Sequence, residues 1–135
     1  MYKIFPIAVC VIASFVLAVD KVIAEPTLLI FGSEGNGNRG HTVFLGCISC
    51  GEYDRNSLRN DLGKYGSSLS PTSIYNDLGK YGSSLSTTSA CNSLASNPPV
   101  VVDTEGNFYG YLTLNDLIGQ KIIDPRRLGA CRDKY

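Results

Sequence analysis

Short runs of apolar, β-branched and aromatic residues alternate with polar turn segments toward both ends of the chain, a pattern typical of β-strands. We predict strands at residues 27–31, 42–45, 100–102 and 108–113. A Gly- and Asn-rich segment, residues 32–41, joins the first two strands, and a polar turn at residues 103–107 joins the last two. Each pair therefore predicts a β-hairpin, and whether the two hairpins share one sheet stays open.

A tandem repeat of 16 residues lies between the two hairpins. Residues 57–72 and 73–88 agree at 13 of 16 positions, and residues 89–104 form a degenerate third copy. Two full copies are too few for a solenoid that makes up a whole protein. We therefore interpret the repeat region, residues 57–104, as an insertion in a small domain.

The apolar residues of one copy, Leu58, Leu62, Tyr65 and Leu69, follow the helical spacing i, i+4, i+7 and i+11. Ser57 suits a helix N-cap, whereas the glycines inside each copy interrupt a continuous helix. The pattern therefore predicts short helical turns in each repeat.

After the second hairpin, residues 115–123 predict a short helix that Thr113 or Asn115 would cap. The fold class that follows is α+β. We expect a small antiparallel sheet of two β-hairpins with an inserted 16-residue tandem repeat of short helical turns.

The N-terminal 24 residues have the three parts of a secretory signal peptide. Lys3 supplies positive charge, residues 4–19 form an apolar run, and a cleavage site follows Ala24. The run is 16 residues long, shorter than the roughly 20 residues of a spanning helix, so an uncleaved anchor is the weaker alternative. We predict cleavage, a single domain at residues 25–135 without a membrane span, and a secreted or periplasmic location.

Four cysteines follow residue 24, namely Cys47, Cys50, Cys91 and Cys131. An even number in a small exported chain predicts two disulfides, and the sequence leaves all three pairings open. Cys47 and Cys50 also form a C-x-x-C motif, which is redox-active where it begins a helix. The residues after Cys50 start a helix poorly, and no second C-x-x-C is present. Structural disulfides are therefore favoured over thiol–disulfide exchange or a zinc site.

Composition narrows the chemistry further. The 12 basic and 12 acidic residues give a net charge of zero, which argues against a nucleic-acid-binding protein. Trp is absent and His41 is the only histidine. This composition excludes most of the usual metal-binding and acid–base catalytic sites. Residues 35–40 match G-x-G-x-x-G, but a strand rather than a helix follows, so we interpret them as a hairpin loop. We predict no catalytic residue, no metal and no cofactor.

Tyrosines are the strongest candidates for a binding surface, because the ring offers a flat apolar face and a polar tip. The candidates are Tyr53, Tyr65, Tyr81, Tyr109 and Tyr111. The repeated Tyr-Gly units would present aromatic platforms to a glycan or an extended peptide. The alternative, which their phase with the leucines favours, is that Tyr65 and Tyr81 pack the repeats against each other or against the sheet.

Three segments together resemble a group of small exported bacterial proteins. They are FLGCISCGEYD at residues 44–54, the tandem NDLGKYGS units, and PPVVVD at residues 98–103 with GNFYGY at residues 106–111. The resemblance covers roughly residues 27–115. It implies a bacterial, exported chain with one intact domain and carries over no catalytic residue. The repeats of those proteins tend to carry an aromatic residue where this chain has Leu62, Leu69, Leu78 and Leu85.

These observations favour a non-enzymatic exported protein that works as a binding or structural module at the cell envelope. Its partner would be an envelope glycan or a protein. Two alternatives stay open. One is a small exported thiol–disulfide redox protein that uses Cys47 and Cys50, and the other is a glycan-binding protein that uses the repeat tyrosines.

Overall fold

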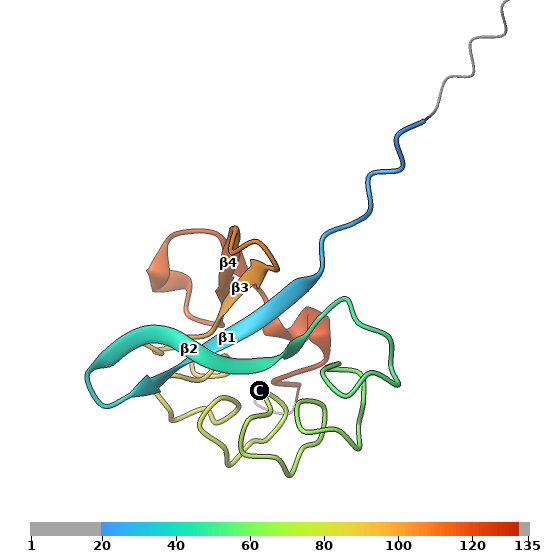
Figure 1. Cartoon of the computed structure of the whole chain (residues 1–135). Helices are drawn as coiled ribbons and strands as arrows, with labels where there is room; N and C mark the ends of the chain where they lie inside the picture. The colour runs from blue at the N-terminus through green and yellow to red at the C-terminus, as the bar shows by residue number, and fades with distance from the viewer. Residues whose placement is uncertain (1–19, 133–135) are drawn as a thin grey trace, which may run out of the picture.

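A computed structural model describes residues 20–132 of the chain. Most of the predicted signal peptide, residues 1–19, therefore lies outside the described residues. Residues 20–27 are exposed and form no regular element, and they lead away from the folded part of the chain (Figure 1).

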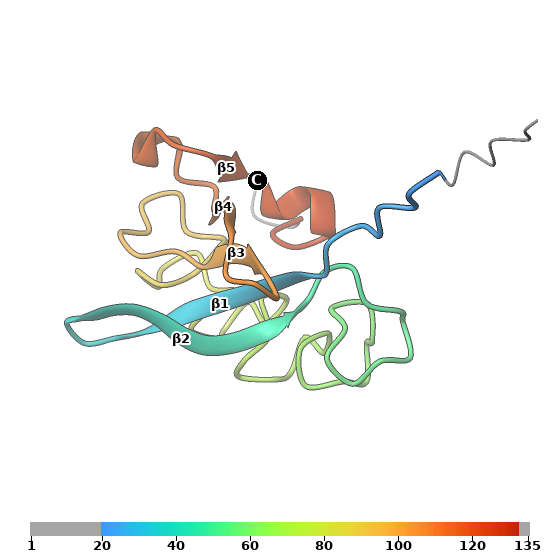
Figure 2. The ribbon, with the colours of Figure 1, turned by 45° about the horizontal axis from the view of Figure 1, so that its top comes forward.

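Five strands form one sheet, in the order β2-β1-β3-β4-β5. The strands are β1 (Leu28–Gly35), β2 (Asn38–Cys47), β3 (Val100–Asp103), β4 (Phe108–Leu112) and β5 (Ile122–Ile123). Neighbours pair antiparallel except for β4 and β5, which are parallel. The expectation of a small, sheet-rich fold is confirmed. The two hairpins share one sheet because β1 pairs with β3, where Ile30 lies opposite Val101. Figure 2 shows β3, β4 and β5 following β1 in that order.

The first hairpin is longer than the sequence pattern indicates. Its strands extend through most of the predicted loop at residues 32–41, and the turn is reduced to Asn36 and Gly37. These two residues have φ values of 55° and 85°, the left-handed conformation that Asn-Gly turns adopt most readily. The polar composition of this segment therefore reflects an exposed strand end and not a long flexible loop.

The helix predicted at residues 115–123 is wrong beyond its first turn. Only a 3-10 helix, η1 (Asp116–Ile118), forms there, and Asn115 caps it by accepting a hydrogen bond from the Leu117 N–H. Gly119 ends it in the left-handed conformation, with φ at 72°. A second 3-10 helix, η2 (Pro125–Leu128), follows β5.

The helical turns predicted in the repeats are also wrong, since residues 57–99 contain no helix. Each full copy is a series of backbone turns in which one N–H donates to a carbonyl three or four residues earlier. Asn60 gives the physical reason. Its Oδ1 accepts the Leu62 N–H at 3.2 Å, and its Nδ2 donates to the Asp54 carbonyl at 3.3 Å. In a helix the Leu62 N–H would donate to the Leu58 carbonyl. Because it donates to the Asn60 side chain here, the backbone forms a turn and not a helix.

One apolar residue of each copy points into the core at an equivalent position, namely Leu58, Ile74 and Ala90. They join Ile30 and Leu45 of the first hairpin in one buried cluster. The repeat region consequently lies along one side of the first hairpin, while β3 and β4 lie on the other side (Figure 1). The helix η2 approaches the repeats, where the Tyr75 hydroxyl donates to the Leu128 carbonyl.

Two glycines let the repeats approach the hairpin closely. A Cβ on Gly46, which has φ at 123°, would lie 2.7 Å from the Leu58 side chain. A Cβ on Gly32 would lie 2.7 Å from the Tyr81 ring. Any larger residue at either position would push the repeats away from the sheet.

Candidate binding surface

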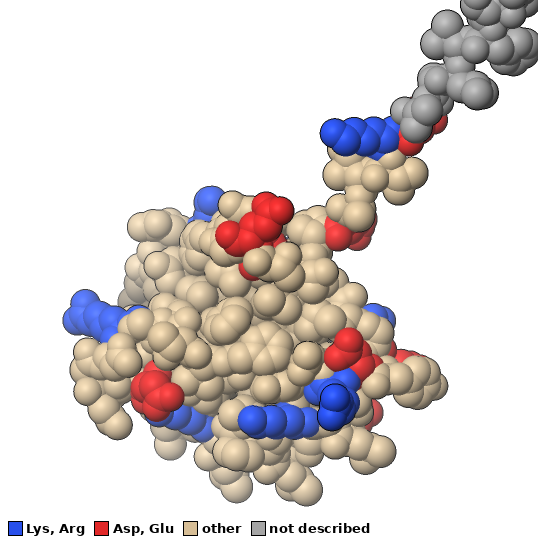
Figure 3. Space-filling model, viewed as in Figure 1, with Lys and Arg blue, Asp and Glu red and all other residues tan. Residues whose placement is uncertain are grey.

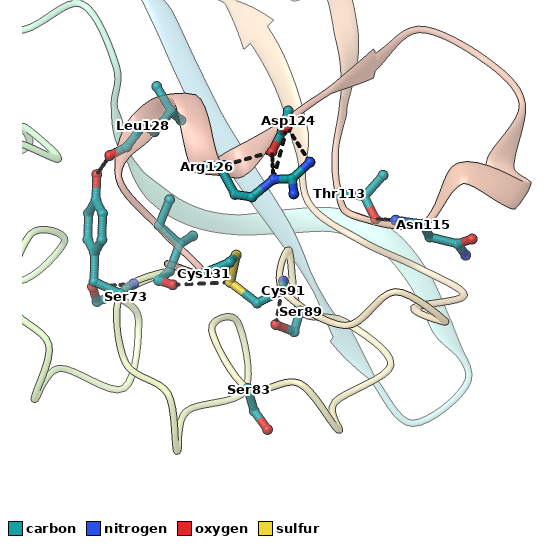
Figure 4. Close-up of a disulfide and its surroundings, with 12 residues drawn as sticks. Ser73, Ser83, Ser89, Cys91, Thr113, Asn115, Asp124, Arg126, Leu128 and Cys131 are labelled. Atoms are coloured by element: carbon teal, nitrogen blue, oxygen red, sulfur yellow. Dashed lines mark hydrogen bonds and ion pairs between the residues drawn. A yellow bond between two sulfur atoms is a disulfide. The ribbon is translucent and has the colours of Figure 1, made fainter. Parts of the chain in front are cut away.

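The four cysteines form two disulfides, as predicted, and the pairs are Cys47–Cys50 and Cys91–Cys131. Cys47 ends β2 and is fully buried, and a bend brings Cys50 back to it. No helix begins at this C-x-x-C, so no helix dipole acts on its thiols. The second bridge joins the third repeat copy to the segment after η2 (Figure 4).

The predicted binding tyrosines do not form one aromatic row. Tyr81 is only 4 % exposed, and its hydroxyl donates to the Ser33 carbonyl at 3.1 Å. Tyr65 is half-buried, with its ring centroid 4.9 Å from that of Phe44. These two repeat tyrosines therefore attach the repeats to the first hairpin, and the buried Tyr81 ring presents no free face for a sugar ring.

The remaining three tyrosines lie elsewhere. Tyr53 is 90 % exposed in the loop after the first disulfide. Tyr109 and Tyr111 lie on β4, where Tyr109 donates a hydrogen bond to Asp103 and Tyr111 packs edge-on against Phe108. Burial raises the pKa of Tyr109, and the Asp103 carboxylate raises it further.

Asp103 organises the turn between β3 and β4. One carboxylate oxygen accepts the N–H groups of Glu105 and Asn107, each at 2.9 Å, and the other accepts the Asn107 side-chain amide at 2.8 Å. The Asn107 amide, together with the backbone donors, holds the pKa of this carboxyl below its ordinary value. Asp103 thus has a structural role that accounts for its buried polar side chain.

The glycine-rich segment at residues 35–40 forms the end of the first hairpin. It borders a polar hollow of about 310 Å³ whose other side is formed by residues of the second and third repeat copies. His41 lies nearby on β2, where its Nε2 is 2.8 Å from the Pro98 carbonyl oxygen. The imidazole is therefore engaged with the backbone, and among residues 20–132 no nucleophilic side chain is hydrogen-bonded to it.

Five leucines of the repeats project into solvent, and the sequence reasoning missed them as surface residues. The first row is Leu62, Leu78 and Leu94, which are 98 %, 97 % and 71 % exposed. The second row is Leu69 and Leu85, at 88 % and 87 %. We call the two sets together the leucine rows. Exposed leucines at repeated positions of a fixed backbone form a candidate binding surface.

A sequence signal for the leucine rows does exist. Every one of the five leucines follows an Asn or Ser by two positions, and in each case the side-chain oxygen of that residue accepts the leucine N–H. Such Asx and Ser turns fix the backbone at the exposed corner of a loop. The residue two positions after the Asn or Ser is consequently held there and directed outward.

The repeats are rigid because their polar groups are satisfied internally. Ser57, Ser73 and Ser89 are fully buried at equivalent positions, and each accepts the N–H of the residue two positions later. Among residues 20–132, every buried side-chain nitrogen or oxygen has a hydrogen-bond partner. The leucine rows are therefore presented by a backbone with little freedom to fold them inward.

In the part of the chain that the structure describes, no group of three or more His, Cys, Asp or Glu side chains is placed to hold a metal ion. Residues 20–132 also include no helix with the length and apolar character that crossing a membrane requires. No protein-family model, curated protein or solved structure matches the chain.

Proposed function

We propose that this chain is an exported, non-enzymatic structural module of the cell envelope that associates with a second copy of itself through the leucine rows. The single observation that carries the proposal is the near-complete exposure of Leu62 and Leu78, at identical positions of two repeats. Export is supported by the signal-like N-terminal sequence and by the two disulfides, which persist in oxidising compartments.

The physical reason for association is the cost of leaving these side chains in water. Burying one leucine side chain contributes about 1.5–3 kcal/mol. At about 25 cal/mol per Å², these contributions correspond to roughly 300–600 Å² of buried apolar surface for the five leucines together. That area is less than the roughly 800 Å² per partner of a standard interface, so we expect a weak and reversible dimer.

A second copy is the partner that the surface suits best. Asp61 and Lys64 flank Leu62 in the first repeat, and Asp77 and Lys80 take the same places in the second. Each loop therefore carries one acid and one base, and two copies do not repel each other. The lower edge of the molecule in Figure 3, where the repeat loops lie, is mainly uncharged, with acidic and basic side chains along its boundary. A twofold arrangement would pair leucine rows of identical spacing.

The test is sedimentation equilibrium of the processed chain over a wide concentration range. We expect a monomer–dimer equilibrium that the double substitution Leu62→Ser and Leu78→Ser weakens by roughly 100-fold or more. The matched control is Leu117→Ser, because Leu117 is 83 % exposed but lies in η1, outside the repeats. The control should leave the equilibrium unchanged.

Two results would overturn the proposal. One is a protein that stays monomeric at all concentrations and binds phosphatidylcholine vesicles through the same two leucines, which would identify a lipid surface as the partner. The other is an equal weakening of the dimer by the control substitution, which would mean that any exposed leucine contributes.

The Cys47–Cys50 bridge favours a second candidate function, thiol–disulfide exchange. The motif is closed in the folded chain, as the oxidised form of an exchange protein would be. Its reduction potential decides between the two roles. A potential near −200 mV with retained fold would support exchange, whereas a value below about −300 mV is typical of a structural disulfide.

A further inference from the structure

Three arginines from separate segments line one hollow of about 280 Å³. They are Arg59 in the first repeat, Arg127 in η2 and Arg132 directly after Cys131. We call this feature the arginine hollow. None of the leucine rows lines it, and none of its lining residues is a carboxylate.

Within the described residues, none of these three guanidinium groups forms an ion pair. Among residues 20–132 the one ion pair joins Arg126 to Asp124, at 2.8 Å. Asp124 interacts electrostatically with Arg127, but the Arg126 side chain donates to both of its carboxylate oxygens (Figure 4). Three unpaired arginines around one depression favour an anion there, since guanidinium donors match the geometry of carboxylate and phosphate oxygens.

The other walls of the hollow are apolar or aromatic. Ile48 and Leu58 supply aliphatic surface, and Tyr75 supplies a ring. The Tyr75 hydroxyl donates to the Leu128 carbonyl at 2.7 Å, so η2 is attached to the second repeat (Figure 4). A ligand that uses both kinds of wall has an anionic group and an apolar body.

The backbone around the arginine hollow is held by the two disulfides, and one of its three arginine side chains is held by a hydrogen bond. Ile48 lies between the two cysteines of one disulfide, and Arg132 follows a cysteine of the other. The Arg59 guanidinium donates to the Cys50 carbonyl at 2.7 Å. The backbone therefore needs little ordering on binding, which favours affinity for a small molecule, while the Arg127 and Arg132 side chains would become ordered on the anion.

We propose that the arginine hollow binds a small organic anion, with the guanidinium groups on its carboxylate or phosphate and its apolar body against Leu58 and Tyr75. This inference goes beyond the self-association proposed above and does not depend on it. Neither Asp61 nor Asp77 lines the arginine hollow, although Asp77 lines an adjoining hollow that shares Tyr75 and Arg132 with it.

The experiment is a calorimetric titration of the disulfide-bonded chain with phenyl phosphate, benzoate, inorganic phosphate and neutral benzyl alcohol. We expect both aromatic anions to bind, inorganic phosphate to bind more weakly, and benzyl alcohol not to bind. Comparison of phenyl phosphate with benzoate identifies which anionic group the site prefers. Failure of all four to bind would overturn the proposal.

Substitutions locate the site. Arg127→Gln and Arg132→Gln should each weaken binding of the preferred anion roughly tenfold or more, the loss expected for one charge-assisted hydrogen bond. Arg132→Lys should recover part of that loss, because lysine keeps the charge without the planar fork. The matched control is Arg39→Gln, which removes the same charge from β2, away from the lining of the hollow.

The control also gives a result that would overturn the proposal. If Arg39→Gln weakens binding as much as the substitutions in the hollow, the anion responds to overall charge and not to this site. Arg127 and Arg132 are exposed, so their variants should keep the unfolding midpoint of the parent chain, which the same samples can show.

Discussion

The Tyr81 hydroxyl donates a hydrogen bond to the Ser33 carbonyl oxygen, at 3.1 Å and across 48 positions of sequence. This contact attaches the second repeat to β1, in a region where Gly32 leaves room for the tyrosine ring. It explains why a tyrosine that the sequence placed among binding candidates is almost completely buried.

Removing that hydroxyl should destabilise the fold without disrupting it. Tyr81→Phe keeps the ring and leaves the Ser33 carbonyl unpaired, so we expect the free energy of unfolding to fall by about 0.5–1.5 kcal/mol or slightly more. Urea denaturation measures the change. Tyr53→Phe is the control, because Tyr53 is exposed and its substitution should alter stability by less than about 0.5 kcal/mol. Equal effects of the two would contradict the role given to Tyr81.

The two disulfides should contribute unequally to stability. Cys91 and Cys131 are 40 positions apart, whereas Cys47 and Cys50 are three apart. Because a longer closed loop removes more entropy from the unfolded chain, Cys91→Ser with Cys131→Ser should cost about 4 kcal/mol, and Cys47→Ser with Cys50→Ser about 2 kcal/mol. Chemical denaturation of each double variant checks the order. A larger cost for the shorter loop would show that native packing around Cys47 outweighs chain entropy.

Gly66 should not tolerate a side chain. A Cβ at this position would lie 2.0 Å from the Asn60 carbonyl oxygen, a backbone atom held in the repeat turn. We expect Gly66→Ala to lower the free energy of unfolding by about 1–3 kcal/mol or more. Gly51→Ala is the control, since an added Cβ there meets no atom within 4 Å. A thermal unfolding scan of both variants would disprove the close approach if their midpoints agreed.

The turn held by Asp103 should make stability dependent on pH. The pKa of Asp103 is lower in the folded chain than in the unfolded chain, chiefly because the Asn107 side chain donates to the carboxylate. The stabilisation is therefore fully present above the ordinary Asp pKa of about 3.9, and it is lost as pH falls through the lower, folded-state value.

The matched substitution is Asp103→Asn, which removes the charge. Its deficit in stability relative to the parent chain should be largest at neutral pH and should shrink in acid. The same substitution should also lower the pKa of Tyr109, which an ultraviolet titration of the phenol measures. A deficit that does not change between pH 7 and pH 3 would mean that the carboxylate charge does not hold the turn.

The sequence pattern located β1 to β4, although β1 and β2 are longer than predicted, and it included Asn115 as one of two candidate caps, because both features depend on local residue preferences. It missed β5, which lies inside the predicted helix at residues 115–123. It failed in the repeats, where the leucines have helical spacing only by coincidence. Leu58 points into the core, while Leu62 and Leu69 point into solvent, although all three are apolar and fit one helical face. Side-chain hydrogen bonds from Asn and Ser decide the backbone there, and a count of apolar positions does not register them.

The disulfide pairing and the arginine hollow depend on contacts between segments that the sequence alone does not show to be neighbours. The disulfide pairing required knowing that a bend follows β2, so that Cys50 returns to Cys47. The arginine hollow required knowing that η2 packs beside the first two repeats, since Arg59 and Arg127 are separated by most of the folded chain. Both relationships follow from tertiary packing and from no local motif.

The two disulfides also differ in the time at which each can form. The Cys47–Cys50 bridge can close as soon as that short segment reaches an oxidising compartment, whereas Cys91 must wait for 40 further residues to arrive. Disulfide formation itself takes seconds to hours. During this interval the outward-facing leucines belong to a chain that lacks its longer bridge. The rate of its closure, and not only the final stability, therefore sets how long incomplete chains can associate wrongly.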